Sequence, residues 1–140
     1  MIKTFTKLSW PTDRWPNFSF KEMACRETGQ CMLDEKLMDA LQALRAQCGF
    51  SLTVTSGYRS PEHSVERSKT RRGAHTYGVA VDIQVSGERA YRVVREALAL
   101  GFSGVGIKQS GEYEQRFIHL DRMSRTVADD FPRPMLWSYS

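Results

Sequence analysis

The chain has 140 residues, of which 41% are hydrophobic and 26% charged, a composition typical of a globular domain. This length suits one domain over residues 1–140 rather than two of ordinary size, and no apolar run approaches the roughly 20 residues of a membrane span. The net charge of +4 favours an anionic partner such as nucleic acid, a cell-wall polymer or a membrane surface. The densest basic cluster has no aromatic residues within it, so nucleic acid is not expected, although the cluster could help to dock an anionic substrate; it comprises Arg67, Lys69, Arg71 and Arg72.

The N-terminal segment, residues 1–17, is rich in aromatic residues and proline, which predicts an irregular arm packed onto the rest of the domain. Its first ten residues contain no continuous apolar run, so no signal peptide is predicted and synthesis in the cytoplasm is expected. A short helix should follow, because Ser19 and Glu22 have the spacing of a capping box.

A longer helix is predicted over residues 34–48, with Asp34 as its N-cap and Gly49 at its end. Its apolar residues recur at helical spacing and predict one buried stripe, formed by Leu37, Met38, Leu41 and Leu44. The alternating, β-branched segment 50–56 predicts a strand that ends in a turn at residues 57–61.

Residues 60–73 are polar and charged, which predicts a surface loop with one helical turn after Pro61. A strand is expected over residues 78–85, where Asp82 faces away from Val81 and Ile83. His63, in the loop, is expected at the surface.

A second helix is predicted over residues 87–100, with Tyr91, Val94 and Leu98 on its buried face. Short strands over 104–107 and 116–121 should be joined by a hairpin turn, and the tail 131–137 is expected to be irregular. Helices mixed with short strands and tight turns predict an α+β fold with a small, mainly antiparallel sheet and packed helices.

The three cysteines are Cys25, Cys31 and Cys48. An odd number without a signal peptide favours reduced, buried thiols. A small loop closed by a Cys25–Cys31 disulfide is the alternative.

Two of the three histidines lie in apolar, strand-like segments that also carry a carboxylate: His75 precedes Asp82, and His119 precedes Asp121. Two imidazoles and one carboxylate are a sufficient protein ligand set for a catalytic zinc ion, with the fourth position left open. We expect a turn to carry His75, the following strand to return Asp82 to the same site, and a neighbouring strand to supply His119.

Several blocks of this sequence resemble the zinc D-Ala-D-Ala carboxypeptidase superfamily, and in particular its phage endolysins and cell-wall peptidases. The resemblance covers roughly residues 18–137, and its blocks occur in order as Ser56-Gly57-Tyr58-Arg59-Ser60-Pro61-Glu62-His63, His75-x-x-Gly78-x-Ala80-x-Asp82-Ile83, Gly104-Val105-Gly106-Ile107 and Phe117-Ile118-His119-Leu120-Asp121.

The resemblance implies Zn²⁺ bound by His75, Asp82 and His119, in a hedgehog/D-Ala-D-Ala-peptidase-like fold. It also implies that Arg59 holds a carboxylate or carbonyl of the substrate, a task suited to a planar guanidinium. The implied activity is peptidase action on peptidoglycan stem peptides.

The chain departs from its relatives near both histidines. Gly73 stands where a serine is common, and Arg116 and Phe117 stand where many relatives have an acid or a histidine. The identity of the general base is therefore left open between three candidates. Asp121 is the first candidate, although it could instead orient a ligand. Glu114 and Glu112 are the others, provided that the turn at 111–116 folds over the metal.

Three functions fit these residues. The leading one is a zinc-dependent peptidase of endolysin type, a monomer that leaves the cytoplasm and cuts peptidoglycan stem-peptide or cross-link amide bonds at the bacterial cell wall. The second is a D,D-carboxypeptidase or dipeptidase acting on small peptides, which needs a closed pocket rather than an open groove. The third is a zinc-stabilised, non-catalytic virion or wall-binding module, favoured by the missing acid at position 116 or 117.

Overall fold

The computed structural model describes residues 1–140 and shows helices and short strands mixed along the chain. In chain order the elements are β1 (Ile2–Thr4), α1 (Phe20–Met23), β2 (Met32–Asp34), α2 (Glu35–Cys48), β3 (Thr53–Ser56), α3 (Ser64–Arg67), the 3₁₀ helix η1 (Ala74–Tyr77), β4 (Ala80–Gln84), α4 (Gly87–Ala99), β5 (Gly104–Lys108), the 3₁₀ helix η2 (Tyr113–Gln115), β6 (Phe117–Asp121) and β7 (Met135–Ser138). The expected α+β fold class is confirmed.

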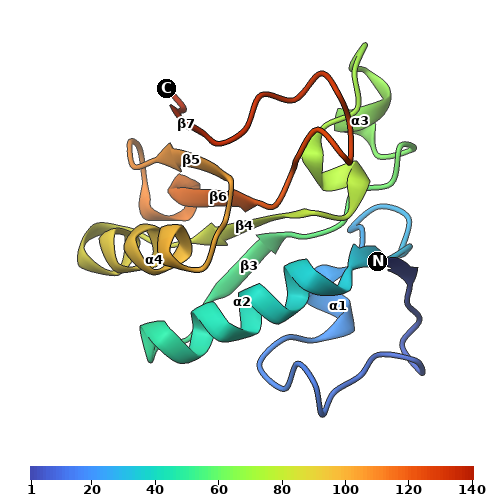
Figure 1. Cartoon of the computed structure of the whole chain (residues 1–140), viewed down its shortest axis with the longest axis horizontal. Coiled ribbons are helices and arrows are strands. Elements are labelled where there is room, and N and C mark those ends of the chain that lie inside the picture. Colours follow the sequence, from blue (N-terminus) through green and yellow to red (C-terminus); the bar gives the residue numbers. More distant parts are fainter.

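The main sheet has five strands in the order β3-β4-β6-β5-β7 (Figure 1). Every neighbouring pair is antiparallel except β5 and β7, which are parallel, so the expected mainly antiparallel sheet is confirmed. Strands β1 and β2 form a separate antiparallel pair that the sequence did not predict.

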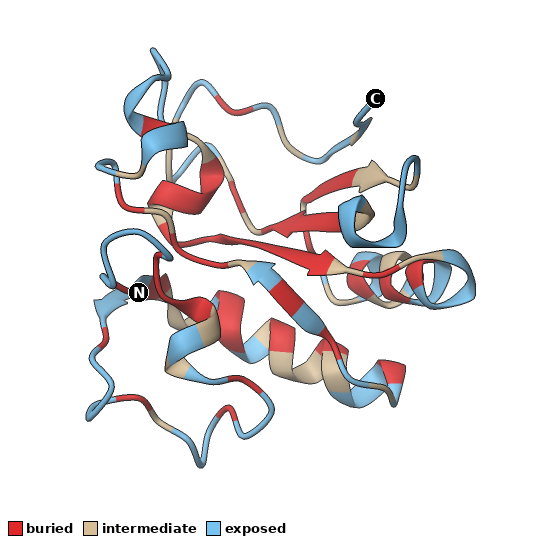
Figure 2. Cartoon of the chain, turned by 180° about the vertical axis from the view of Figure 1, so that it is seen from behind, coloured by how far each residue is buried: buried red, intermediate tan, exposed pale blue.

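One face of the main sheet is covered by α2 and α4. A single core cluster joins the helices to the sheet, and its members include Leu41 of α2, Val93 of α4, Ile83 of β4 and Ile118 of β6. Strands β4 and β6 are buried along almost their whole length (Figure 2). Because side chains alternate between the faces of a strand, Asp82 and His119 lie on the face opposite the two helices.

The local helix signals are confirmed in α1 and α2. Ser19 and Glu22 form the capping box at the start of α1. In α2 the side chain of Asp34 accepts a hydrogen bond from the amide of Lys36, and Gly49 ends the helix in the left-handed conformation, with φ of 73°. The predicted apolar stripe of α2 is fully buried. These features depend on residues within one or two helical turns, which is why sequence could predict them.

The predicted buried face of α4 is wrong for two of its three residues, whereas Val94 is partly buried and packs against the core. Tyr91 is 71% exposed and Leu98 is 59% exposed. The buried residues are instead Ala90, Val93 and Ala97, one position earlier along the helix. This stripe is small or β-branched and lets the helix approach the sheet and α2 closely, whereas the larger side chains lie on the flank in solvent.

The N-terminal arm packs onto the core, as expected, through aromatic side chains. Phe5, Trp10 and Trp15 are buried and meet edge to edge, with ring centroids 5.3–5.5 Å apart. The indole N–H of Trp10 also donates a hydrogen bond to the carbonyl of Phe18 at 2.9 Å. The arm is not wholly irregular, because β1 lies within it.

The prediction of an irregular tail over residues 131–137 is wrong from Met135 onward, where β7 begins. After β6 the chain runs toward α3 and returns to the edge of the sheet as β7 (Figure 1). The amide of Met135 donates to the carbonyl of Ser103 and that of Tyr139 to Ile107, both at 2.9 Å. We call residues 122–140 the C-terminal strap. The unpaired edge of β5 supplies the partner that makes this segment a strand.

The three cysteines are free and buried, which confirms the prediction of reduced, buried thiols. None of the helices is long and apolar enough to cross a membrane.

Candidate metal centre

Three elements bring His75, Asp82 and His119 together. His75 lies on η1, Asp82 on β4 and His119 on β6, where Asp82 and His119 face each other directly across the ladder. One ligand atom from each of the three lies within 4.8 Å of the other two, and all three residues are buried. The arrangement of turn, returning strand and neighbouring strand is the one expected from the sequence.

The ring of His75 is oriented by a main-chain carbonyl. Its Nδ1 lies 2.8 Å from the carbonyl oxygen of Gly57, and its Nε2 lies 3.2 Å from Oδ1 of Asp82. Because a carbonyl oxygen can only accept, Nδ1 carries the proton and donates it. In the neutral ring, the lone pair of Nε2 is then directed toward Asp82, as a metal ligand requires.

His119 is oriented in the opposite sense, by a carboxylate. Its Nε2 lies 2.8 Å from Oδ2 of Asp121, while its Nδ1 lies 2.9 Å from Oδ1 of Asp82. In each ring, therefore, one nitrogen forms a hydrogen bond with an oxygen outside the cluster, and the other nitrogen faces Asp82. This donor set, two imidazoles and one carboxylate with both rings held from behind, fits a zinc ion.

Charge within the centre is strongly coupled. Burial alone would raise the pKa of Asp82, but His75 and His119 hold it well below its ordinary value. Burial alone would lower the pKa of His119, but Asp121 and Asp82 raise it to about 8. Without a metal, the two carboxylates therefore favour the protonated form of His119, and protons and metal compete for the same nitrogen.

Asp121, the first candidate for the general base, lies behind His119 and is fully buried. Oδ1 accepts hydrogen bonds from the amide of Met123 and Nε of Arg133, and Oδ2 accepts from His119 and Nη2 of Arg133. A carboxylate has about four lone-pair positions, and all are used here. His119 and Arg133 overcome the effect of burial and lower the pKa of Asp121 to about 2. This geometry matches the orienting role rather than that of a base.

A cleft of about 570 Å³ opens over the centre. Its lining combines cationic and aromatic side chains, namely Arg59, Lys69, Arg71, Arg133, Phe117, Phe131, Trp137 and Tyr139. A larger cavity of about 710 Å³, between the N-terminal arm and α1, shares no lining residue with it.

Arg59 lies at the centre, as expected. Its Nε donates to Oγ of Ser56 at 3.2 Å, Nη1 donates to Oε2 of Glu66 at 3.3 Å, and Nη2 forms an ion pair with Oδ2 of Asp82 at 3.8 Å. Glu112 and Glu114 are exposed, and neither lines the cleft. The turn at 111–116 therefore does not fold over the centre.

His63 is not the surface residue expected. Its side chain is only 15% exposed, and its Nδ1 accepts a hydrogen bond from the amide of Val65 at the start of α3. Its Nε2 lies 3.3 Å from Glu27. The sequence pattern missed this role because histidine is an uncommon helix cap.

The family model described as Peptidase M15 matches residues 16–121. The chain belongs to the Peptidase M15 family. This confirms the resemblance to the zinc D-Ala-D-Ala carboxypeptidase superfamily. Searches of curated proteins and of solved structures found no match. Family membership and the His-Asp-His cluster together support a zinc metallopeptidase.

The M15 match ends at Asp121, and the C-terminal strap beyond it contributes residues that the sequence did not single out. Arg133 holds Asp121, and the ring of Trp137 lies 5.2 Å from that of His119. A Cβ atom on Gly106 would lie 2.6 Å from the Trp137 indole, so glycine at this position makes room for the strap. The alternation of Met135, Trp137 and Tyr139, all lining the cleft, is the signal that could have predicted β7.

Proposed function

We propose that this M15 peptidase is zinc-dependent and hydrolyses amide bonds of peptidoglycan stem peptides or cross-links, in the manner of a phage endolysin. The observation that carries the proposal is the placement of His75, Asp82 and His119 on the floor of a cleft with a cationic rim. Peptidoglycan stem peptides bear free carboxylates, which such a rim would attract. The proposal includes one hedgehog/D-Ala-D-Ala-peptidase-like domain over residues 1–140, acting as a monomer at the cell wall.

The residues that would hold the zinc ion are His75 through Nε2, His119 through Nδ1, and Asp82. When bound there, zinc supplies Lewis-acid catalysis of amide hydrolysis.

Other side chains would bind and orient. Arg59 has five N–H groups, of which three are directed at protein oxygens, so the others can bind a substrate carboxylate or carbonyl. Asp121 fixes the ring of His119. The aromatic wall of Trp137 and Tyr139 would pack against the peptide and exclude water from the scissile bond.

One observation favours a second function, a zinc-stabilised binding module without catalysis. Asp82 is the only carboxylate among the residues that line the cleft, and it belongs to the ligand set. A hydrolase needs a group that accepts a proton from water. For Glu114 to serve, the turn that carries it would have to move toward the cleft when substrate binds.

The deciding experiment is loss of turbidity of purified peptidoglycan, with mass spectrometry of the released fragments. The proposal requires clearing that EDTA and His119→Ala abolish and that His63→Ala preserves. The new termini would name the bond cut. Stoichiometric zinc binding without clearing, but with release of D-Ala from small peptides, would establish the carboxypeptidase. Zinc binding with neither activity would establish the non-catalytic module.

A further inference from the structure

A buried acid, Glu66 of α3, lies beside the cleft without lining it. Its side chain is 1% exposed, and it is the one buried glutamate of the chain. A buried carboxylate is costly unless it is paired and hydrogen-bonded. The partners of Glu66 therefore indicate why it is there.

All three partners of Glu66 line the cleft. Oε2 accepts hydrogen bonds from Nζ of Lys69 at 2.9 Å and from Nη1 of Arg59 at 3.3 Å, and Oε1 accepts from the amide of Gly73 at 3.1 Å. Because the two cations bind the same oxygen, they lie next to each other. Burial works to raise the pKa of Glu66, but Lys69, Gly73 and Arg59 keep it below its ordinary value.

The close approach of Gly73 belongs to the same arrangement. A Cβ atom at this position would lie 3.2 Å from both Oε1 of Glu66 and Nζ of Lys69. Glycine leaves this space to the carboxylate and the ammonium group. The hydrogen bond also fixes the chain two residues before His75.

The two cations keep binding capacity on the cleft side. Lys69 has three donors and uses one on Glu66, and Arg59 has two N–H groups without a protein acceptor. Together they carry two positive charges against the single charge of Glu66. The donors that remain free on Lys69 and Arg59 can bind one further carboxylate. Asp82, which lies 3.8 Å from Arg59, offsets part of the charge of Arg59.

We propose that Glu66 is a positioning residue that holds Arg59 and Lys69 together as a binding site for a free carboxylate on the residue that follows the scissile amide. The inference rests on the proposed peptidase function and makes Lys69 a determinant of specificity. Substrates with a carboxamide at that place lose the charge that the pair binds.

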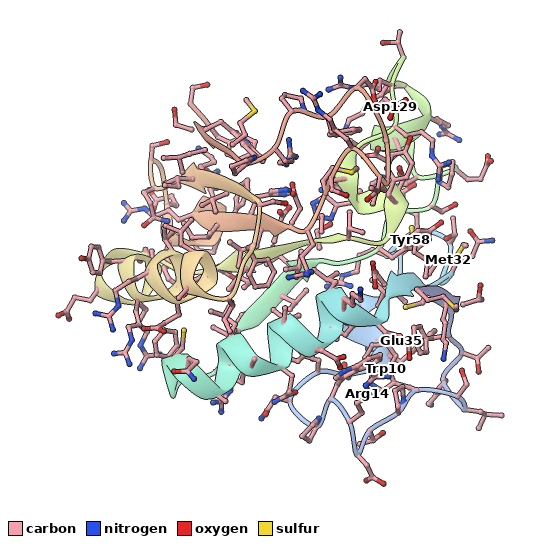
Figure 3. The ribbon with its side chains drawn as sticks, viewed as in Figure 1. Trp10, Arg14, Met32, Glu35, Tyr58 and Asp129 are labelled. Carbon is pink, nitrogen blue, oxygen red and sulfur yellow. The ribbon has the colours of Figure 1, made fainter.

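The test uses matched peptides that differ only in a free carboxylate or a carboxamide on the residue after the scissile amide. The variants are Glu66→Gln and Lys69→Gln in the zinc-loaded protein. The matched control is Glu35→Gln. Glu35 also binds an arginine and a lysine, Arg14 at 2.6 Å and Lys3 at 3.2 Å. It lies on the N-terminal side of the molecule, away from Asp129 in the strap (Figure 3).

We expect both variants to raise KM for the carboxylate peptide by about tenfold, since a hydrogen bond to a charged group contributes about that factor. The turnover number kcat should stay within about twofold of the wild-type value, because Arg59 and Lys69 bind the substrate and do not react with it. Both constants for the carboxamide peptide should be unchanged. Glu35→Gln should change neither constant. Equal losses on both peptides, or an unchanged KM, would overturn the inference.

A second variant and a second measurement cover misfolding of Glu66→Gln and an inactive wild type. If Glu66→Gln does not fold, Lys69→Gln decides, because that side chain is 41% exposed. If the wild type cleaves neither peptide, the peptidase proposal fails by itself, and NMR titration of the same two peptides tests the subsite alone. Tighter binding of the carboxylate peptide, lost in Lys69→Gln, would support the subsite. Equal binding of both peptides would overturn it.

Discussion

Arg133 donates two parallel hydrogen bonds to Asp121, from Nε to Oδ1 at 3.0 Å and from Nη2 to Oδ2 at 2.8 Å. Asp121 in turn accepts from His119, whose other nitrogen faces Asp82. Arg133 of the C-terminal strap thereby orients His119, a candidate metal ligand, through Asp121. The strap is part of the candidate metal centre, although it lies beyond the residues matched by the family model.

Arg133→Ala should weaken zinc binding. Loss of such an orienting partner typically costs about 10–100-fold in metal affinity. Arg133→Lys should also weaken it, because an ammonium group cannot form the two parallel bonds. Competition with a chromophoric chelator measures the effect. Arg125→Ala, at an exposed strap residue, is the control. Unchanged affinity in Arg133→Ala would show that Asp121 needs no support from the strap.

Asp82→Asn and His119→Ala should each abolish stoichiometric zinc binding at micromolar protein, because each removes one of the three proposed protein ligands. His63→Ala should bind zinc like the wild type, since His63 caps α3 and takes no part in the cluster. Metal analysis after dialysis, together with circular dichroism to verify folding, makes the comparison. Zinc retained by both ligand variants would place the metal elsewhere.

Zinc affinity should rise with pH and level off above about pH 8. Asp121 and Asp82 raise the pKa of His119 to about 8 in the metal-free protein, despite its burial. Below that pH a proton must leave before Nδ1 can bind metal. Calorimetric titration from pH 6 to pH 9 should show the trend, together with proton release that disappears at the upper end. A flat profile would contradict the charge coupling.

The stability of the metal-free protein, unlike its zinc affinity, should fall as the pH rises. The raised pKa of His119 means that the folded state binds its proton more tightly than the unfolded chain, whose histidines titrate near pH 6.5. The stabilisation is complete below about pH 6.5 and is lost as the pH rises through about 8. The Tm of the EDTA-treated protein should fall across this range. His119→Gln should remove the slope.

Gly106→Ala should impair hydrolysis while zinc binding persists. The added Cβ would lie 2.6 Å from the Trp137 indole and 2.7 Å from the ring of Tyr139, which forces the aromatic wall outward. A displacement of this size can lower kcat/KM by about tenfold or more. Ser138→Ala, at an exposed residue of β7 that does not line the cleft, tests the specificity of the effect. Wild-type kinetics in Gly106→Ala would exclude the wall from substrate binding.

The sequence by itself determined the local elements and the chemistry of the centre. Ser19 and Asp34 as caps, Gly49 as a helix end and the stripe of α2 depend on neighbours within a few residues. The candidate ligands could also be identified from the sequence, because two of its three histidines lie in apolar segments that carry a carboxylate. Strand alternation then placed Asp82 opposite Val81 and Ile83.

Only the tertiary structure decided which face of α4 is buried, that the tail pairs with β5, and which nitrogen of each histidine faces Asp82. It also moved Asp121 from candidate base to support of His119, through Arg133, and brought Glu66 to Arg59 and Lys69. These features depend on contacts between distant segments and on which partner each buried polar atom finds. Propensity and periodicity describe only residues that are close in the sequence. They therefore cannot specify which distant side chains donate hydrogen bonds to a buried carboxylate.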